Sequence, residues 1–403
     1  MRRTFGLAAL AVMLGWGPAS AQQVTIKIGV LTDMASLYAD DTGIGSVIAA
    51  KLAAADFMKD HPKFKVEVVS ADHQNKADIG SQIANQWIDV DHVDMIADVP
   101  NSGVALAIAQ IVAQKNKVFV ASGPATSDLT GPKCQPTTVH WTYDTWMLAN
   151  GTGKAIVKNG GDTWFFLTSD YAFGHALERD TMAVVKANGG KVLGAVRHPI
   201  NSNDFSSFLL QAQTSKAKIV GLANAGGDTI NAIKQGSEFG IVAGGQKFAG
   251  LLVFAPDVAA LGLKTAQGLM FTETFYWDLN DGTRAWTKRW NKERNAAGKL
   301  PSMNMAGVYS GTLHYLKAVA AVGSAADGKA VVAKMKAMPA EDSVYGKSTV
   351  RADGRVLHPA YLFEVKKPEE SKYPGDLYKL RATIPADEAF RPLKDGGCPL
   401  VGG

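Results

Sequence analysis

Residues 95–130 read MIADVPNSGVALAIAQIVAQKNKVFVASGPATSDLT, and this region decides the fold class of the chain. Its two apolar runs, residues 93–99 and 118–121, predict buried parallel strands that each break into small polar residues rich in Gly and Pro. The segment between them, residues 103–114, has helical periodicity, and Asn101 or Ser102 is placed to cap it. Ligands bind at the carboxyl ends of neighbouring strands in an open α/β sheet, because hydroxyls and backbone N–H groups meet there. The region therefore predicts a site that holds a small anionic molecule.

Strands and helices alternate on both sides of this region. Ahead of it, strands are predicted at residues 24–33 and 64–72 and amphipathic helices at 43–59 and 77–90. A second series follows, with strands at residues 163–170, 191–198, 217–224 and 247–254 and helices at 145–159, 172–188, 204–214 and 229–239. Buried strands that alternate with helices of this length predict doubly wound parallel sheets. Two series of similar size predict two similar lobes.

The last third of the chain has a different pattern. Residues 269–277, LMFTETFYW, form an aromatic run, and three helical segments follow at residues 282–297, 305–322 and 329–338. Residues 348–367 predict a β-hairpin, because Asp353-Gly354 is a strong turn signal. Residues 377–384 predict a last strand.

The first residues, MRRTFGLAALAVMLGWGPASAQQ, have the order of parts of a secretory signal peptide. Two arginines precede an apolar stretch, and small residues precede Gln22, so cleavage is expected after Ala21. An uncleaved anchor would need about 20 apolar residues, and this stretch is shorter. Without residues 1–21 the chain keeps 382 of its 403 residues, enough for two domains with full cores. We therefore expect a soluble protein outside the cytoplasm.

Cys134 and Cys398 are the only two cysteines. In an oxidising compartment, two cysteines favour one disulfide, whereas a metal site would need more ligands nearby. Both lie in segments rich in Gly and Pro. We predict a Cys134–Cys398 disulfide that ties the C-terminal tail to the first half of the chain.

Charge and motifs argue against several functions. The formal charge is +5, falling to +3 without Arg2 and Arg3, and the basic residues are scattered, which disfavours a nucleic-acid partner. The eight histidines show no pair at metal-ligand spacing. Residues 148–155 fail as a phosphate loop, because Leu148 replaces its first Gly and Ala155 its Ser or Thr. No G-x-S-x-G motif is present. We therefore expect no enzyme activity, no metal and no cofactor.

Several stretches stand in a characteristic order. After the leader come IKIGVLTDMASLYADDTG (26–43), VASGPATSDLT (120–130), TWFFLTSDYAFG (163–174), FTETFYW (271–277) and YGKSTVRADGRVLHPAYLFEV (345–365). Together they resemble the periplasmic leucine-binding-protein family, the type I solute-binding proteins of branched-chain amino-acid-type ABC importers. The resemblance covers about residues 24–367.

The resemblance implies two Rossmann-like lobes with a ligand cleft between them. Three crossovers would join the lobes near residues 140–143, 271–275 and 339–345. Lobe one would comprise residues 22–140 and 273–340, and lobe two residues 141–272 and 341–403 with the tail. The implied protein is a periplasmic monomer. Its partners would be a small carboxylate ligand and an ABC permease with its ATPase at the inner membrane.

The resemblance also implies ligand contacts from both lobes. In lobe one, backbone groups and hydroxyls of two strand-end loops would face the ligand carboxylate. In lobe two, the tyrosine of the D-x-x-x-G loop at residues 170–174 would close over the ligand. The candidate ligand-binding residues are Asn101, Ser102, Gly103, Ser122, Ala125, Thr126, Tyr171, Asp228, Tyr38 and Tyr143.

Structural interpretations of these residues remain open. Ser102, Ser122 and Thr126 are residue types that cap helices and form turns. Large aromatics such as Tyr38 and Tyr143 are more often buried for packing than for ligand contact.

The ligand class is open as well. Amino-acid-binding relatives hold the α-ammonium with a lobe-two carboxylate after the strand that corresponds to residues 250–258. Here that segment offers Leu252 and Phe254, with Asp257 further along, although Asp228 could substitute. We therefore expect a carboxylate with an apolar or aromatic body rather than a branched-chain amino acid. The alternative to transport is a ligand sensor of the same fold that signals to a receptor kinase or chemoreceptor.

Overall fold

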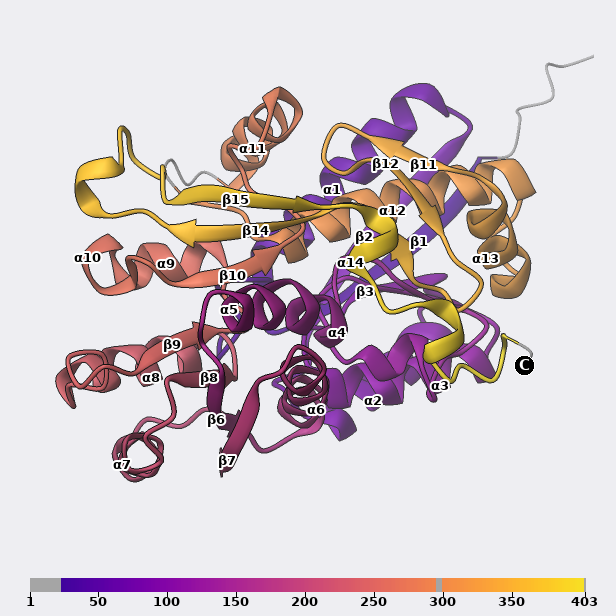
Figure 1. The fold of residues 1–403 in the computed structure, drawn as a ribbon. Helices are drawn as coiled ribbons and strands as arrows, with labels where there is room; N and C mark the ends of the chain where they lie inside the picture. Colours follow the sequence, from indigo (N-terminus) through magenta and orange to yellow (C-terminus); the bar gives the residue numbers. More distant parts are fainter. Residues whose placement is uncertain (1–22, 295–298, 402–403) are drawn as a thin grey trace, which may run out of the picture.

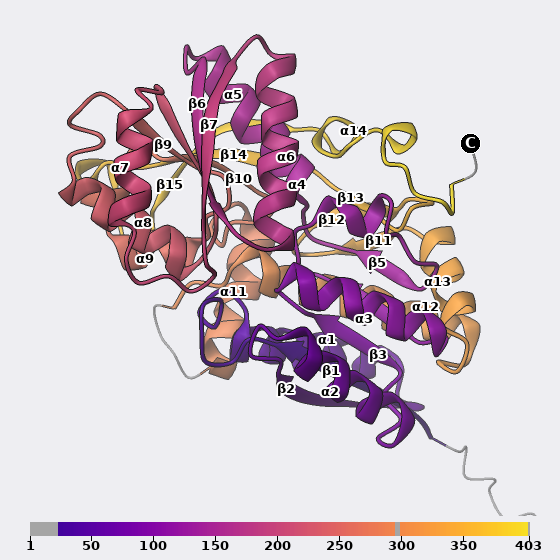
Figure 2. The ribbon, with the colours of Figure 1, turned by 90° about the horizontal axis from the view of Figure 1, so that it is seen from below.

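The computed structural model describes residues 23–294 and 299–401. They form two α/β lobes, each built on a parallel sheet with helices packed on it (Figures 1 and 2). The predicted fold class is confirmed. The expected signal peptide at residues 1–21 lies outside the described residues.

The first sheet has five parallel strands in the order β2-β1-β3-β4-β5. They are β1 Val24–Thr32, β2 Phe64–Asp72, β3 Met95–Asp98, β4 Val118–Ala121 and β5 Thr138–His140. Its helices are α1 Gly43–Asp60, α2 Ala77–Asp89 and α3 Ser102–Gln114. Every residue of β3 and β4 is buried, as expected for strands that are covered on both faces. Strands β3 and β4, the two strands of residues 95–130, are therefore direct neighbours inside the sheet.

The second sheet has four parallel strands in the order β7-β6-β8-β9. They are β6 Thr163–Ser169, β7 Lys191–His198, β8 Ile219–Ala223 and β9 Lys247–Gly250. The helices of this part are α4 Thr145–Leu148, α5 Lys154–Lys158, α6 Ala172–Ala187, α7 Ser206–Thr214, α8 Gly227–Glu238, α9 Ala255–Leu261 and α10 Leu263–Ala266.

The helix predicted at residues 145–159 is interrupted by a π-helical turn at Ala149–Gly153. Here the backbone passes close to the side chain of Thr272, because a Cβ on Gly151 would lie 2.3 Å from Oγ1 of that residue. The periodic pattern of the sequence did not reveal this turn.

Three helices return to lobe one after the aromatic run: α11 Asp281–Arg294, α12 Met303–Val322 and α13 Gly328–Ala337. Helix α12 lies along α1 (Figure 2). Gly45 permits this approach, because a Cβ there would lie 2.5 Å from the side chain of Met305. The indole of Trp290 also donates to the backbone oxygen of Gly45 at 3.0 Å.

The remaining strands form two small antiparallel sheets, β10-β14-β15 and β11-β12-β13. They are β10 Met270–Glu273, β11 Ala340–Asp342, β12 Gly346–Val350, β13 Val356–Leu357, β14 Ala360–Val365 and β15 Tyr378–Ile384. The predicted hairpin at 348–367 is only partly present. Its turn joins β12 to β13, but the chain then breaks at His358-Pro359 and continues as β14 in the other sheet. Pro359 lacks the N–H that a continued ladder would need.

The C-terminal region contacts both lobes. Strands β11 and β12 contact α12 and α13, whereas β14 pairs with β10. The assignment of residues 341–403 to lobe two therefore stays a prediction.

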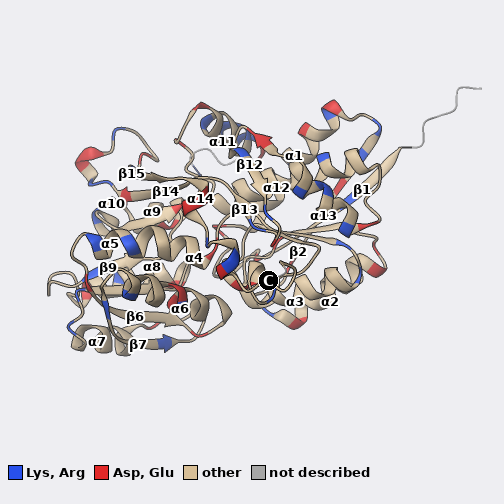
Figure 3. Cartoon of the chain, turned by 45° about the vertical axis from the view of Figure 1, so that its right-hand side comes forward, with Lys and Arg blue, Asp and Glu red and all other residues tan. Residues whose placement is uncertain are grey.

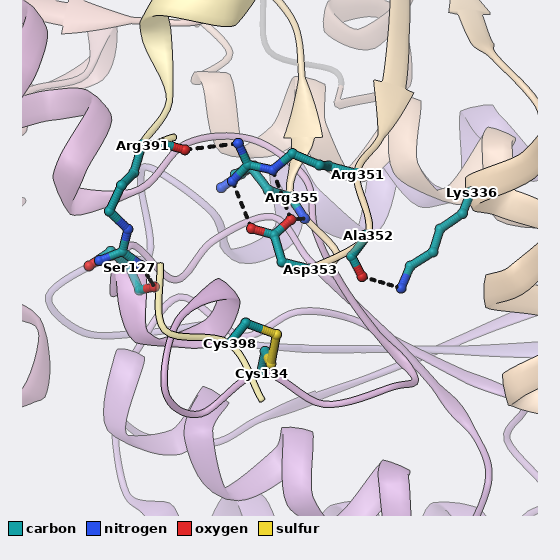
Figure 4. Close-up of a disulfide and its surroundings, with 9 residues drawn as sticks. All are labelled: Ser127, Cys134, Lys336, Arg351, Ala352, Asp353, Arg355, Arg391 and Cys398. Atoms are coloured by element: carbon teal, nitrogen blue, oxygen red, sulfur yellow. Dashed lines mark hydrogen bonds and ion pairs between the residues drawn. A yellow bond between two sulfur atoms is a disulfide. The ribbon is translucent and has the colours of Figure 1, made fainter. Parts of the chain in front are cut away.

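The predicted disulfide is present between Cys134 and Cys398, whose Cα atoms are 5.6 Å apart (Figure 4). Beside it, the guanidinium of Arg391 donates to the backbone oxygen of Ser127 at 3.2 Å. The tail is thus fixed to the loop that follows β4.

Lys and Arg positions are interspersed with Asp and Glu positions along the ribbon of both lobes (Figure 3). This distribution agrees with the small net charge of +5 for the full chain. Among the helices within residues 23–294 and 299–401, none combines the length and the apolar character needed to span a bilayer.

Candidate functional site

A pocket lies between the lobes, at the carboxyl ends of both parallel sheets. The space between its wall atoms is about 260 Å³, part of which opens to solvent. The wall consists of Tyr38, Pro100, Gly123, Ala125, Tyr143, Tyr171, Phe173, Ala225, Leu252, Phe254 and Asn304. None of these residues carries a charged side chain at neutral pH.

Five helices begin at this pocket. Pro100 lies two residues before α3, and Ala225 lies two residues before α8. Tyr171 and Phe254 are the N-cap residues of α6 and α9, and Asn304 is the second residue of α12. A helix N-terminus carries roughly half a positive charge and unpaired N–H groups. These N-termini contribute partial positive charge at a pocket whose wall carries no Lys or Arg.

Two tyrosines join the lobes across the pocket. The hydroxyls of Tyr38, from the loop after β1, and Tyr171, at the start of α6, are hydrogen-bonded to each other. Burial raises the pKa of Tyr38 well above its ordinary value, and burial raises that of Tyr171 as well. Both side chains are therefore neutral at physiological pH, and their contact holds the two lobes together.

Tyr143 is positioned by residues distant in sequence. Its hydroxyl donates to the backbone oxygen of Gly123 at 2.8 Å. Its own backbone oxygen accepts from Nη1 of Arg355 at 2.8 Å. Arg355 is fully buried, lies over the ring of Phe390 at 4.6 Å and pairs with Asp144 at 3.5 Å. The turn between β12 and β13 thus supplies the group that holds this part of the wall.

The loop after β3 has a strained backbone. Asp98 and Val99 have φ of 78° and 61°, values that a β-branched residue such as Val99 rarely adopts. Strain of this kind persists only where the surrounding structure imposes it, and it is common at functional sites. Burial raises the pKa of Asp98 to about 7, and the hydroxyls of Ser46 and Thr32 only partly oppose this shift.

Gly123 and Asp98 are in close contact below the pocket wall. A Cβ on Gly123 would lie 2.6 Å from Oδ1 of Asp98 and 2.8 Å from the Cα of Pro100. Only glycine lets the loops after β3 and β4 approach this closely.

Of the ten candidate ligand-binding residues, the structure places Tyr38, Ala125, Tyr143 and Tyr171 on the pocket wall. The other six, Asn101, Ser102, Gly103, Ser122, Thr126 and Asp228, are absent from the wall. Whether any of the ten binds ligand stays a prediction.

The polar candidates in lobe one connect the loops to one another. Oδ1 of Asn101 accepts from the backbone N–H groups of Gly103 and Val104 at 3.0 and 3.1 Å, so Asn101 is the N-cap of α3. Oγ of Ser102 accepts from the backbone N–H of Thr126 at 3.2 Å. Within the described residues, Oγ of Ser122 is fully buried and has no hydrogen-bond partner. Ser122 is thus the candidate with a free hydroxyl.

Asp228 is engaged inside lobe two. Its carboxylate accepts from the backbone N–H groups of Asn201 and Ser202 at 3.1 and 2.8 Å. Burial raises its pKa to about 6, and these two hydrogen bonds oppose the shift. Asp228 therefore stabilises the loop between β7 and α7.

Several wall residues were not in the candidate set. The apolar character of Leu252 and Phe254 was visible in the sequence, and so was the place of Phe173 in the D-x-x-x-G loop. No sequence signal pointed to Asn304, because it lies in the first turn of a helix about 180 residues after the strand-end loops.

A larger hollow lies in lobe two, where the space between the wall atoms is about 2080 Å³ and partly opens to solvent; its wall includes Ile219, Lys247 and Lys264. It is located at the amino ends of β6, β8 and β9. Ligands of open α/β sheets bind at the carboxyl ends, so we assign the site to the pocket between the lobes. Across residues 23–294 and 299–401, no cluster of three His, Cys, Asp or Glu side chains is arranged to hold a metal ion.

Two parallel-sheet lobes that meet over an uncharged pocket define the type I two-lobed solute-binding fold. A family model described as periplasmic binding protein matches residues 25–372, and the chain belongs to this family. The family consists of substrate-binding proteins, which confirms the resemblance drawn from the motifs.

Solved structures agree with this assignment. A periplasmic binding protein from Burkholderia mallei is 51% identical, with a TM-score of 0.90 over 94% of this chain and 99% of its own. A branched chain amino acid ABC transporter periplasmic ligand-binding protein from Burkholderia xenovorans LB400 is 38% identical, with a TM-score of 0.81 over 93% of this chain and 99% of its own. A solute binding protein from R. palustris, in complex with 4-hydroxybenzoate, shares the fold at 23% identity, with a TM-score of 0.81 over 90% of this chain and 97% of its own.

Proposed function

We propose that this protein captures a small carboxylate with an apolar or aromatic body and delivers it to the permease of an ABC importer. The observation that carries the proposal is the composition of the pocket wall, which combines aromatic and apolar side chains with helix N-termini and has no charged side chain.

The wall disfavours a free amino acid. A buried ammonium group without a carboxylate partner is costly. Two buried acids are absent from the pocket wall: Asp228 binds backbone N–H groups, and Asp98 is packed against Gly123. Because burial raises the pKa values of both, to about 6 and about 7, these acids also have a reduced negative charge near neutral pH.

The wall suits the carboxylate and the apolar body of the proposed ligand. Helix N-termini from both lobes favour a carboxylate. Phe173, Phe254 and Leu252 provide apolar contact for the body.

Family membership supports the transport role. The relative from Burkholderia xenovorans is named as a ligand-binding protein of an ABC transporter, and the structure from R. palustris holds an aromatic acid. In the proposed mechanism the ligand bridges both lobes and stabilises the closed form, which the permease then recognises. This role requires export to the periplasm and cleavage of the leader after Ala21, and it involves no chemical conversion of the ligand.

Mass spectrometry of small molecules released from the purified protein would identify the natural ligand. Calorimetry would then compare benzoate, hydroxybenzoates and 4-methylpentanoate with leucine, isoleucine and valine. We expect micromolar binding of one or more acids and no binding of the amino acids. Micromolar binding of the amino acids, abolished in a folded Asp228→Ala variant, would contradict the proposal.

A further inference from the structure

Asp41 is a buried acid at the boundary between the two lobes. It lies in the loop between β1 and α1, which also carries the pocket residue Tyr38, and it is 2% exposed. Its backbone N–H donates to the backbone oxygen of Tyr38 at 3.0 Å. Its backbone oxygen accepts from Oγ of Ser302 at 2.5 Å. Asp41 is therefore fixed in lobe one beside the pocket.

The loop before α8 in lobe two packs against this part of lobe one. The backbone N–H of Gly227 donates to the backbone oxygen of Leu37 at 3.4 Å. A Cβ on Gly226 would lie 2.5 Å from the same oxygen and 3.4 Å from Oδ2 of Asp41. Because these contacts join the two lobes, we expect them to be lost when the lobes separate. The carboxyl group of Asp41 would then gain contact with solvent.

In the closed arrangement the carboxyl group of Asp41 lacks the partners that a negative charge needs. Its Oδ1 is buried and has no hydrogen-bond partner among the described residues. An ionised carboxylate that is buried without partners is costly, whereas its protonated form is much less so. Burial of this group by lobe two therefore favours the protonated form.

The charged groups that act most strongly on Asp41 repel a negative charge. They are Asp33 directly after β1, Asp40 in the same loop, Asp257 in α9 and Glu273 in β10. Asp228 of α8 is engaged by backbone N–H groups. The cation of α11, Arg294, lies over the ring of Trp290 at 5.1 Å and acts on the exposed Asp40. Burial and the neighbouring acids together raise the pKa of Asp41 well above its ordinary value.

Asp257 is the acid that could compete with Asp41 for the proton. Burial raises the pKa of Asp257 to about 7. However, its Oδ2 accepts from the backbone N–H of Phe254 at 3.0 Å, and a hydrogen bond of this kind favours the ionised form. Oδ1 of Asp41 has no such donor among the described residues. The proton is therefore assigned to Asp41.

We propose that closure of the lobes around the solute takes up one proton at Asp41, so that the protein binds its solute more tightly as the pH falls. The open form exposes the carboxyl group and favours its ionised state, whereas the closed form favours the protonated state. Affinity then decreases as the pH rises toward the pKa of the closed form. Opening at the permease would release the proton together with the solute. This inference rests on the lobe closure of the proposed function, but not on which solute the pocket takes.

The test measures affinity by calorimetry at pH 6, 7 and 8. The probe is whichever of benzoate, 4-methylpentanoate and leucine binds most tightly, since each keeps its charge over this range. Wild type should lose about fivefold or more in affinity from pH 6 to pH 8, because uptake of one proton changes affinity by up to about tenfold per pH unit. Asp41→Asn, which is neutral at every pH, should bind more tightly than wild type at pH 8 and show little dependence on pH.

Asp40→Asn is the matched control, because it removes the same charge from the exposed neighbouring position. This variant should keep most of the dependence on pH. If Asp41→Asn does not fold, calorimetry of wild type at pH 7 in buffers with different enthalpies of ionisation still counts the protons directly. Net proton uptake on binding is the expected result.

Two results would overturn the role of Asp41 and leave the proposed function intact. One is the same dependence of affinity on pH in wild type and in a folded Asp41→Asn variant. The other is binding without proton uptake by wild type. Binding of leucine with no binding of the acids would instead contradict the proposed class of solute, and leucine would then serve as the probe for Asp41.

Discussion

The hydroxyl of Tyr38 in lobe one is hydrogen-bonded to the hydroxyl of Tyr171 in lobe two, across the pocket. Because the bond joins residues of the two lobes, we expect it to break when the lobes separate and therefore to stabilise the closed form relative to an open one. We predict that Tyr38→Phe and Tyr171→Phe each weaken ligand binding by about fivefold, equivalent to about 1 kcal/mol for one net hydrogen bond.

A double-mutant cycle checks this prediction by calorimetry. The double variant should bind about as well as either single variant, because both remove the same bond. Small-angle scattering should show a smaller radius of gyration for wild type at saturating ligand. Strictly additive losses of ligand affinity in the double variant, or an unchanged radius of gyration at saturating ligand, would contradict a role of this bond in lobe closure.

Replacing Gly123 with alanine should weaken ligand binding by tenfold or more. The new methyl group would lie within 3 Å of Oδ1 of Asp98 and of the backbone of Pro100, so the loops after β3 and β4 must separate. Overpacking of this kind costs about 1–3 kcal/mol of stability.

Gly153→Ala is the control for this prediction, since a Cβ there would lie 3.4 Å from the methyl group of Thr181, an ordinary contact. Calorimetry and thermal unfolding of both variants provide the measurement. Unchanged affinity in a folded Gly123→Ala variant would show that the close contact of the two loops does not shape the pocket.

Asp98 should make stability depend on pH in a defined direction. Its pKa is about 7 in the folded protein against 3.8 for the ordinary carboxyl group, so the folded state holds the proton more tightly. The free energy of unfolding then falls as the pH rises from about 4 to about 7 and is flat for this group above that range.

The comparison uses wild type and Asp98→Asn, because buried histidines contribute the opposite slope. Burial lowers the pKa values of His73 and His358 to about 4, so these side chains favour the folded state increasingly as the pH rises. The free energy of unfolding in urea is measured for both proteins at pH 4.5 and 7.5. The value for wild type, relative to that for Asp98→Asn, should be lower at pH 7.5 than at pH 4.5. A pH-independent difference between the two proteins would mean that Asp98 keeps an ordinary pKa.

The Cys134–Cys398 disulfide should stabilise the protein without contributing to binding. It closes a loop with a sequence separation of 264 residues and lies outside the pocket wall. Cys398→Ser should lower the free energy of unfolding by roughly 2–5 kcal/mol and leave ligand affinity unchanged. Reduced wild type should unfold at the same temperature as the reduced variant, and denatured, unreduced wild type should show no free thiol in an Ellman assay. Two thiols per molecule in that assay would reject the bond.

Local patterns in the sequence determined the two lobes, most of the helices and the position of the site. Residues 93–99 and 118–121 are apolar runs bounded by turn residues, and they became β3 and β4 because buried parallel strands require that composition. The site could be predicted at their carboxyl ends for the same reason, since topology alone places ligands there. The disulfide followed from there being two cysteines in a chain whose first residues predict an export leader.

Only the tertiary structure decided which side chains form the pocket wall. Asn304 and Arg355 come from segments far along the chain: α12 brings Asn304 to the pocket wall, and the β12–β13 turn brings Arg355 to the backbone oxygen of Tyr143. Asp228 looked like a candidate partner for an ammonium group, but its carboxylate is bound to two backbone N–H groups that no sequence pattern reveals. Periodicity and turn signals report interactions between near neighbours, whereas the identity and orientation of wall residues depend on long-range packing and hydrogen bonding.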